Sequence, residues 1–554
     1  MVDANADSGK VDGGGHDTID PNPNIRALFV PSAPERVAVA DVRLLHLFLL
    51  RYRRRSLSLS LSAVLSMVLF SRLSMRSLSA TNRTAAIARH MASSSGTPAP
   101  EEPTVLYEEN GAMRRYILNR PRKMNSLDTA MLDSLAARLE PWDKAELAGI
   151  IVGSSDGRAF CAGGDVAGVV KNAESDDTRP KAIEFFRREF GLNHTLAALS
   201  KPYVAVMNGI TFGGGMGLVF PAPFRVATEK TSVAMPETKI GYCPDVGASY
   251  YLSRLDGQIG TYLGLTSAVL PGRAAFEHGL ATHYISSARV PILYERLAAL
   301  ENPTLRQIDD AIEELHWERE PSDPVSSLTG AVRNALDSAF SHNTVEEIIA
   351  ALKKYAEGST DSDVVQWAKD TLAVLNERSP TGLKVALLAI RKGKDLSLLD
   401  ALKMELGFAT AFCSGATPDF KAGVTHVLID KKKTGYPSWS PATLEEVSVT
   451  ALESTFFKQD NAAEGLILPD SFNVTDDPPP HPMRFALPTE EEIGQIVMGR
   501  HQASGSSALT LSELINKLED LKRGKYGVAD KVKEVVSRRC GHNKREGEYL
   551  EWKH

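Results

Sequence analysis

The sequence of 554 residues has few cysteines and no long apolar run, and both shortages restrict what the protein can be. Only four cysteines are present and none forms a C-x-x-C pair, so we expect neither a disulfide framework nor a cysteine-based metal site. No apolar stretch approaches the roughly 20 residues that a membrane-spanning helix needs. The net charge of −6 supplies no basic field, so a nucleic-acid partner is not expected.

A further shortage concerns acidic residues, which are absent between Asp41 and Glu101. The same stretch has many serines, no lysine and a series of arginines, namely Arg43, Arg51, Arg53, Arg54, Arg55, Arg72, Arg76, Arg83 and Arg89. This composition is typical of a mitochondrial transit peptide, so residues 1–102 are predicted to be a disordered N-terminus that directs import into the matrix. A disordered basic tail and a signal anchor over Leu57–Phe70 are the alternatives that remain open.

The rest of the chain divides by its hydrophobic pattern. Strand, glycine-rich loop and helix patterns recur over 103–290, which predicts an α/β layered core. Amphipathic helical patterns dominate 291–460, and Pro- and Asp-rich residues predict a linker over 461–488. Capping-box residues, Thr489 with Glu492 and Thr510 with Glu513, predict a helical extension over 489–554.

Individual elements of the predicted core can be assigned from local signals. Val105–Tyr107 and Arg115–Leu118 are predicted strands on either side of an Asn-Gly turn. Asp128 is expected to cap the helix that follows. Leu147–Val152 and Tyr203–Met207 have the continuous apolar character of buried strands.

Two glycine-rich turns, Ala159–Asp165 and Asn208–Gly217, each follow a predicted apolar strand. Glycines allow a backbone N–H to approach a ligand closely, and a turn at a helix N-terminus leaves N–H groups unpaired. Two such groups from separate turns can hold one oxygen atom and so form an oxyanion hole. The second turn has neither the Gly-Lys-Ser/Thr ending of a phosphate-binding loop nor the spacing G-x-G-x-x-G. Either turn taken alone would favour a purely structural role in packing.

These turns and a third segment, Met235–Gly247, strongly resemble the enoyl-CoA hydratase/isomerase (crotonase) superfamily in residues, order and spacing. Within it the pattern is most similar to the hydrolases that act on 3-hydroxyisobutyryl-CoA in valine breakdown. The resemblance covers about 104–457 and includes Ser379-Pro380-Thr381 and Val427–Lys431. It implies a spiral of ββα turns followed by a helical C-terminal region.

The resemblance also implies roles for particular residues. The N–H groups of Ala162 and Gly214 would form the oxyanion hole for the thioester carbonyl, and Glu237 would be the catalytic carboxylate. Glu189 and Asp245 would line the acyl pocket. The rest of the first turn would lie beside the substrate, namely Gly163, Gly164 and Asp165. A carboxylate beside a polarised carbonyl can act as a general base or as a nucleophile that forms a mixed anhydride, and both routes remain open.

One absence separates the activities within the superfamily. Hydratases use two carboxylates, and in their pattern the second lies two residues after the glycine run, where this sequence has Gly217. The hydrolase pattern is therefore favoured over a hydratase or isomerase, although Gly247-Ala248-Ser249 has small residues where glycines are expected. A non-catalytic mitochondrial scaffold that uses the same core is the alternative from another class of function.

Other polar residues receive ordinary roles. Cys161 has no histidine close in sequence and is interpreted as a small buried core residue. His283 is interpreted as a hydrogen-bonded core histidine and not as a base. Arg120, Arg122 and Lys123 are candidates for contacts to the CoA phosphates. The predicted partner is an acyl-CoA substrate, with no metal or redox cofactor. Homo-oligomerisation and a protein partner for the C-terminal extension are further expectations.

Overall fold

The folded region begins with the predicted hairpin, formed by β1 (Val105–Asn110) and β2 (Met113–Leu118). Gly111 stands in the turn at φ +56°, a conformation that glycine adopts without strain. This computed structural model describes residues 102–553 except 321–322, 433, 459–464, 470–480, 506 and 543–547. The predicted transit peptide and most of the predicted linker therefore lie outside the described residues.

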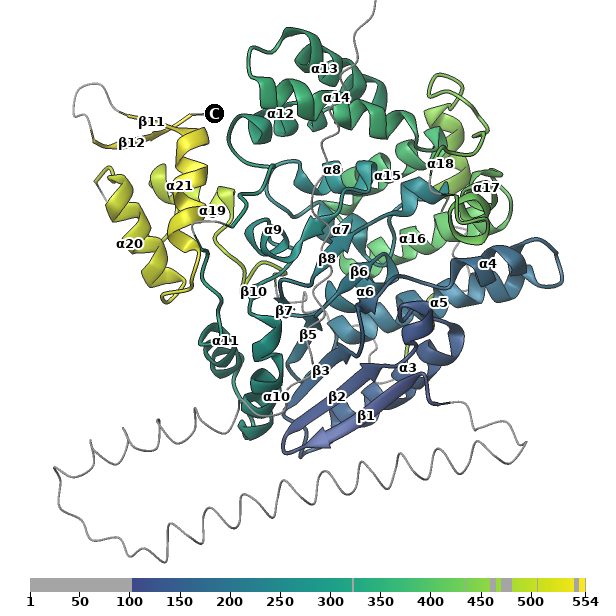
Figure 1. Cartoon of the computed structure of the whole chain (residues 1–554), viewed down its shortest axis with the longest axis horizontal. Coiled ribbons are helices and arrows are strands. Elements are labelled where there is room, and N and C mark those ends of the chain that lie inside the picture. The colour runs from purple at the N-terminus through teal and green to yellow at the C-terminus, as the bar shows by residue number, and fades with distance from the viewer. Residues whose placement is uncertain are drawn as a thin grey trace, which may run out of the picture. The chain divides into compact units, whose positions relative to one another are not determined.

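β1 and β2 are the edge of a six-stranded sheet with the order β1-β2-β3-β5-β7-β10 (Figure 1). Its other strands are parallel to β2, namely β3 (Ile150–Ser155), β5 (Tyr203–Met207), β7 (Phe224–Ala227) and β10 (His283–Tyr284). These strands are almost continuously apolar because elements cover both faces of a parallel sheet. The strand predicted from Leu147 begins at Ile150 instead, and the Leu147 side chain is 80% exposed.

A second sheet of four short strands has the order β4-β6-β8-β9. Its members are β4 (Ala159–Cys161), β6 (Ile210–Phe212), β8 (Ser232–Ala234) and β9 (Leu270–Pro271). A strand of the first sheet is followed by a strand of the second and then by a helix, so the chain advances as repeated ββα turns. Each glycine-rich turn leaves the second sheet and enters a helix, which brings the two turns to one edge.

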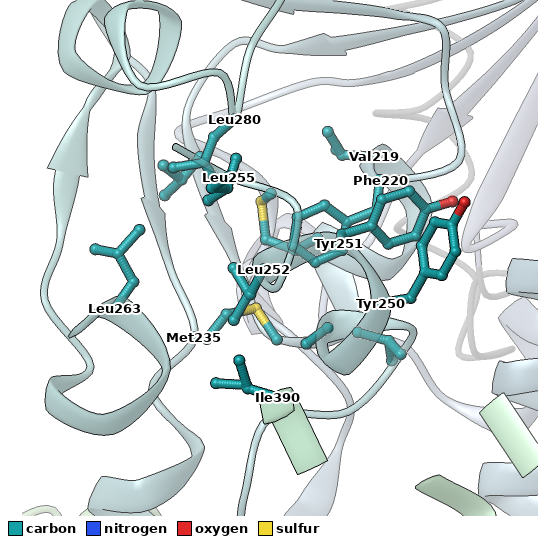
Figure 2. Close-up of a cluster of buried hydrophobic side chains, with 14 of the residues drawn as sticks. Val219, Phe220, Met235, Tyr250, Tyr251, Leu252, Leu255, Leu263, Leu280 and Ile390 are labelled. Atoms are coloured by element: carbon teal, nitrogen blue, oxygen red, sulfur yellow. The ribbon is translucent and has the colours of Figure 1, made fainter. Parts of the chain in front are cut away.

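The helices of this spiral cover the sheets. They are α3 (Thr129–Lys144), α4 (Val166–Ala173), α5 (Arg179–Ala197), α6 (Gly214–Val219), α7 (Ala248–Leu252), α8 (Ile259–Thr266) and α9 (Gly272–Glu277), with short 3-10 turns η1 (Pro121–Lys123), η2 (Glu237–Ile240) and η3 (Ser287–Arg289). Asp128 caps α3 as predicted, because its side chain accepts a hydrogen bond from the Met131 N–H at 2.9 Å. Apolar side chains of α7 and α8 meet those of α6 and α15 in the core (Figure 2).

A helical region follows the spiral, as expected. It comprises α10 (Val290–Ala299), α11 (Leu305–Glu313), α12 (Gly330–Phe340), α13 (Val345–Gly358), α14 (Ser362–Asn376), α15 (Pro380–Gly393), α16 (Leu398–Cys413), α17 (Asp419–Val424), the π-helical turn η4 (Thr425–Ile429) and α18 (Val449–Phe456). Ser379 caps α15 by accepting from the Gly382 N–H and donates to Asp419 at 2.6 Å. This bond joins the start of α15 to α17 inside the same unit.

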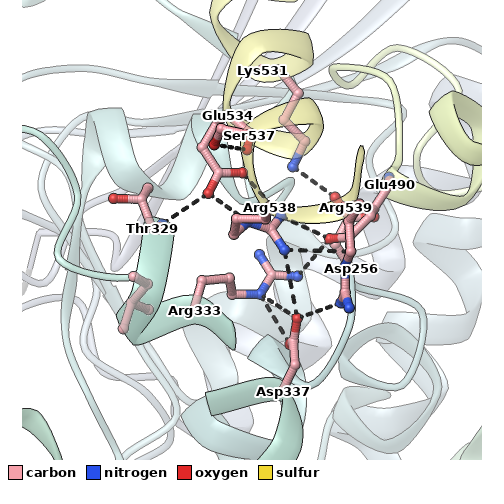
Figure 3. A network of polar contacts seen from close by, with 12 residues as sticks. Asp256, Thr329, Arg333, Asp337, Glu490, Lys531, Glu534, Ser537, Arg538 and Arg539 are labelled. Atoms are coloured by element: carbon pink, nitrogen blue, oxygen red, sulfur yellow. Dashed lines mark hydrogen bonds and ion pairs between the residues drawn. The ribbon is translucent and has the colours of Figure 1, made fainter. Parts of the chain in front are cut away.

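The C-terminal extension contains α19 (Glu490–Val497), α20 (Leu511–Leu521) and α21 (Val528–Arg539), with Thr510 and Glu513 forming the predicted capping box. A final hairpin, β11 (Cys540–His542) with β12 (Leu550–Trp552), is not predicted from the sequence. In Figure 1 the extension, drawn in yellow, lies beside α9, α11 and α12. A buried network of arginines and carboxylates joins it to α12 (Figure 3).

Across the described ranges, no helix combines the length and the apolar character needed to cross a bilayer.

Candidate active site

Three buried carboxyl groups from separate elements form the centre of the site. Glu189 lies in the middle of α5, Glu237 begins η2 directly after Pro236, and Asp245 lies in the loop before α7. They are only 2%, 6% and 5% exposed, respectively. The three are close enough that Glu189 and Glu237 both raise the pKa of Asp245. The fold thus brings together three carboxyl groups, of which Glu189 and Asp245 are the farthest apart in the chain, at a separation of 56 positions.

Burial changes the protonation of these groups. It raises the pKa of Glu189 to about 8, and burial together with the nearby Glu189 raises the pKa of Glu237 to about 8. Burial, followed by Glu189 and Glu237, holds the pKa of Asp245 well above its usual range. Carboxyl groups that titrate near neutral pH can both take up and release a proton during a reaction. The cluster has the properties of an acid–base site.

The carboxyl oxygens are also incompletely hydrogen-bonded. Glu189 Oε1 and Glu237 Oε2 are buried without a hydrogen-bond partner among the described residues. An unsatisfied buried polar atom costs on the order of 1–3 kcal/mol, so such atoms are uncommon unless a ligand or water completes the site. These two oxygens are therefore available to a bound molecule.

The two glycine-rich turns meet directly beside these oxygens. A Cβ atom on Gly213, which has φ +49°, would lie 2.6 Å from Glu237 Oε1. A Cβ atom on Gly214 would overlap Glu189 Oε1 and lie 3.1 Å from the nitrogen of Gly164. Any side chain at either position would thus displace a carboxylate. The glycines allow the backbone of α6 to contact both glutamates.

The backbone donors of the first turn differ from the expectation. The Ala162 N–H donates to the carbonyl oxygen of Met124 at 3.0 Å, so it is not free to form the predicted oxyanion hole. Gly163 has φ +105°, which turns the chain so that the next N–H, that of Gly164, lies beside Gly214. No described residue accepts a hydrogen bond from the Gly164 N–H. The two neighbouring N–H groups without an acceptor in the described chain are therefore those of Gly164 and of Gly214, the first residue of α6.

Asp165, at the end of the first glycine-rich turn, lies close to the basic residues of η1 and its flanks. The Asp165 carboxylate receives a hydrogen bond from Arg120 at 3.1 Å, which orients it toward η1. Arg120 also donates to the carbonyl oxygen of Ser126, so it holds the first turn in place. Arg122 and Lys123 are exposed in η1, and neither forms an ion pair within the described chain.

Two further candidates have the structural roles predicted for them. Burial raises the pKa of the Cys161 thiol to about 12, which removes its nucleophilic form at neutral pH. His283 is 1% exposed and forms hydrogen bonds with Thr282 and Asp309. Burial lowers the pKa of His283, so it is a neutral core histidine.

A fourth buried carboxylate, Glu405 of α16, was not predicted. It accepts hydrogen bonds from the N–H groups of Gly247 and Ser249 at 2.6 and 2.9 Å and from the Ser249 hydroxyl at 2.6 Å. Burial raises its pKa to about 7 against the effect of these bonds. Because the bonds fix the residues just after Asp245, Glu405 orients the Asp245 loop, where Val246 has φ +55°. The sequence signal for Glu405 is its place among apolar residues of the predicted helix, next to Leu402 and Leu406, which indicates a buried carboxylate.

Comparisons with known proteins identify the family and the fold of this chain. A sequence model of the enoyl-CoA hydratase/isomerase family matches residues 113–456. The chain belongs to the enoyl-CoA hydratase/isomerase family. An enoyl-CoA hydratase from Rhodobacter sphaeroides is a similar solved structure, with a TM-score of 0.57 and 30% identity over 66% of this chain and 100% of the other. The predicted α/β crotonase fold is confirmed.

Two curated relatives have different names. The small ribosomal subunit protein mS47 of Neurospora crassa is 39% identical over 464 residues, which are 82% of this chain and 88% of the relative. The mitochondrial 3-hydroxyisobutyryl-CoA hydrolase of Homo sapiens is also 39% identical, over 383 residues that cover 69% of this chain and 95% of the relative. The crotonase core is thus similar to both an enzyme and a ribosomal protein.

Gly217 separates this family member from the two-carboxylate pattern by shape as well as by sequence. A Cβ atom at this position would lie 2.6 Å from Val246 Cβ and 2.8 Å from Asn193 Nδ2. No space remains there for a glutamate side chain, so a second carboxylate would require α5 or the Asp245 loop to move. The carboxyl groups of this site come from Glu189, Glu237 and Asp245 and not from the position of Gly217.

The raised pKa values predict an unusual dependence of stability on pH. Between about pH 7 and 8.5 folded Glu189 and Glu237 retain protons that unfolded glutamates have lost, so the free energy of unfolding should fall as pH rises. Each group contributes a slope of up to roughly 1.4 kcal/mol per pH unit. Urea unfolding of the wild type and of Glu237→Gln at several pH values measures the difference.

Glu237→Gln should show the shallower slope, because one titrating group has been removed. The measurements are made above pH 7 to avoid the titration of His278 and His316. Burial lowers the pKa of both histidines, so at lower pH their titration makes stability rise with pH, opposite to the effect of the glutamates. Equal slopes for the two proteins would show that Glu237 is ionised in the folded state throughout the window.

Proposed function

We propose that the protein hydrolyses the thioester of 3-hydroxyisobutyryl-CoA to free CoA and 3-hydroxyisobutyrate, a step of valine breakdown. The observation that carries this proposal is the meeting of Glu237 with the free N–H groups of Gly164 and Gly214 in one buried cluster. The names of the hydrolase relatives support the choice of substrate. The lack of space for a carboxylate at Gly217 favours hydrolysis over hydration.

The reaction follows from the charges that it creates. The N–H groups of Gly164 and Gly214 stabilise the negative charge that develops on the thioester oxygen, and one such donor typically contributes about 2.7–4 kcal/mol. Water bonds to the carbonyl carbon while its proton passes to the ionised form of Glu237, which becomes more abundant as the pH rises toward its raised pKa of about 8. The carbon–sulfur bond then breaks, and Glu237 returns the proton to the CoA sulfur. Attack by Glu237 itself, with water opening the resulting anhydride, is the second route.

The other groups bind and orient the substrate. Glu189 and Asp245, which retain protons near neutral pH, can donate hydrogen bonds to the acyl group. Arg122 and Lys123 lie exposed next to the first glycine turn, where they can contact the CoA phosphates. Each step uses a backbone amide or a carboxyl group of the chain, so the proposed mechanism needs no metal or redox cofactor.

The test is the release of free CoA from several acyl-CoA thioesters by the purified full chain, measured with a thiol reagent. We expect rapid release from 3-hydroxyisobutyryl-CoA and slow release from isobutyryl-CoA, which lacks the hydroxyl. Crotonyl-CoA is the control, because a hydratase would remove its double bond without releasing CoA. Hydration of crotonyl-CoA without release from any thioester would replace the hydrolase proposal with a hydratase.

We also propose that the protein acts in mitochondria, where the names of the hydrolase relatives place those proteins. The acid-free arginine-rich N-terminus fits this location. A second candidate function is that of a small ribosomal subunit component. It is favoured by the longer alignment with the Neurospora crassa mS47 protein, which covers 82% of the chain against 69% for the human hydrolase.

A further inference from the structure

Asn193 is a buried amide that the mechanism above leaves unused. It lies on α5 one helical turn after Glu189, on the same face of the helix, and is 1% exposed. Neither its Oδ1 nor its Nδ2 atom has a hydrogen-bond partner in the described chain. An amide with both polar atoms buried and unpaired is destabilising, so its retention needs a reason.

The surroundings of Asn193 connect it to the site. Glu189 and Asn193 face α6 in succession, since Glu189 adjoins Gly214 and Asn193 adjoins Gly217. The space beside Gly217 is shared by Asn193 and Val246, and Val246 directly follows Asp245. The amide therefore stands between the helix that carries Glu189 and the loop that carries Asp245.

We propose that Asn193 is a specificity-determining residue that forms a hydrogen bond with the β-hydroxyl of the acyl group. This inference rests on the proposed function, because it takes a β-hydroxyacyl-CoA as the ligand. An amide can donate to and accept from a hydroxyl, so one substrate hydroxyl satisfies an atom that is otherwise unpaired. An acyl chain without the hydroxyl leaves the amide buried and unsatisfied, and sites of this kind reject such analogues strongly.

The experiment compares two thioesters in two variants. Asn193→Leu keeps the number of side-chain heavy atoms and the branch at Cγ, and it cannot form hydrogen bonds. We expect it to lower kcat/KM for 3-hydroxyisobutyryl-CoA by about 10- to 100-fold and to change that for isobutyryl-CoA by less than about threefold. Thr195→Val on the same helix is the matched control, because Thr195 is equally buried but donates to the Gly191 carbonyl oxygen at 2.9 Å. Thr195→Val should leave the ratio unchanged.

A structural role and a specificity role predict different outcomes. Equal losses for both thioesters in Asn193→Leu, or no loss for either, would overturn the assignment. Replacing an unpaired buried amide with an apolar side chain should not lower the thermal unfolding midpoint. If Asn193→Leu does not fold, Asn193→Ala gives the same comparison of the two substrates.

The experiment distinguishes a failure of the proposed hydrolase function from a failure of the role proposed for Asn193. A wild-type protein that releases CoA from neither thioester is not this hydrolase, and discrimination is then measured as binding of the same two thioesters by calorimetry. Tighter binding of the hydroxylated thioester in the wild type but not in Asn193→Leu would still support the role of Asn193. Equal discrimination by the two proteins, or no binding of either thioester, would refute it.

Discussion

Replacing Glu237 with glutamine should reduce kcat for CoA release from 3-hydroxyisobutyryl-CoA by about 10²- to 10⁴-fold, the range typical of a lost general acid–base group. Glutamine has nearly the shape of glutamate but cannot accept a proton from water or attack a carbonyl. The 6% exposed side chain should keep its position because Gly213 leaves space for an oxygen there. The fall should therefore appear in kcat, measured with a thiol reagent at saturating substrate.

The control is Glu314→Gln, which removes the same charge from an exposed pair with Arg296. Its side chain is 69% exposed, and exposed pairs of this kind contribute little, so activity and stability should stay within error of the wild type. Turnover of Glu237→Gln within a few-fold of the wild type would refute the catalytic role of Glu237. The chemistry would then have to depend on Glu189 or Asp245.

The same variant distinguishes the enzyme from the ribosomal component. A protein that acts only as a scaffold does not need an ionisable group at the buried position of Glu237. Glu237→Gln should then still co-sediment with small ribosomal subunits and should support their function fully. Co-sedimentation together with loss of CoA release would show that one chain carries both properties on separate surfaces.

Much of this site could be anticipated from the sequence because its residues lie in continuous local motifs. Each of Glu237 and Gly214 occupies a short turn whose conformation depends mainly on neighbouring residues. The expected role of the Ala162 N–H as an oxyanion donor conflicts with its hydrogen bond to the Met124 carbonyl oxygen, for a backbone reason. Gly163 at φ +105° reverses the direction of successive N–H groups, and no side-chain pattern reports that torsion.

The unpredicted residues depend on contacts between distant parts of the chain. Glu405 holds the Asp245 loop through bonds to residues about 156 positions earlier. Asn193 matters because Gly217 and Val246 leave its amide beside them without a partner. Both are polar residues buried in helices whose other buried side chains are mostly apolar, which indicates an unusual position but not the ligand or group that lies beside it. The final hairpin has strands of only three residues, too short for a pattern of period two to be recognised.

The attachment of the C-terminal extension is the other feature that the sequence did not reveal. The chain pattern predicts helices beyond a linker, whereas the structure shows these helices joined to the core by buried charges (Figure 3). Glu490, which begins α19, bonds Arg333 of α12 at 3.2 Å and Arg538 of α21 at 2.9 Å. Burial would raise the pKa of Glu490, yet Arg538 and Arg333 hold it below its usual value. Glu490 is therefore ionised, and its bonds connect α12 of the core to α21 of the extension. We call this buried charged contact between core and extension the seam.

Replacing Glu490 with glutamine should thus destabilise the seam strongly. It keeps the volume but leaves Arg333 and Arg538, whose side chains are each 1% exposed, with one counter-charge fewer. Removing one partner of a buried ion pair typically costs about 3–5 kcal/mol, because the other charge stays buried without compensation. Urea unfolding should show this loss, and limited proteolysis should release α19–α21 before the core is cut.

Glu491→Gln is the control, since Glu491 is exposed on the same helix and its change should stay within about 0.5 kcal/mol. A loss below about 1 kcal/mol for Glu490→Gln would show that the remaining carboxylates, Asp337 and Glu534, compensate the arginines. If Glu490→Gln keeps CoA release but no longer co-sediments with ribosomal subunits, the extension serves the partner and the core serves the reaction. Loss of both would mean that the seam also supports α7, because Asp256, just beyond this helix, accepts a hydrogen bond from the Glu490 N–H.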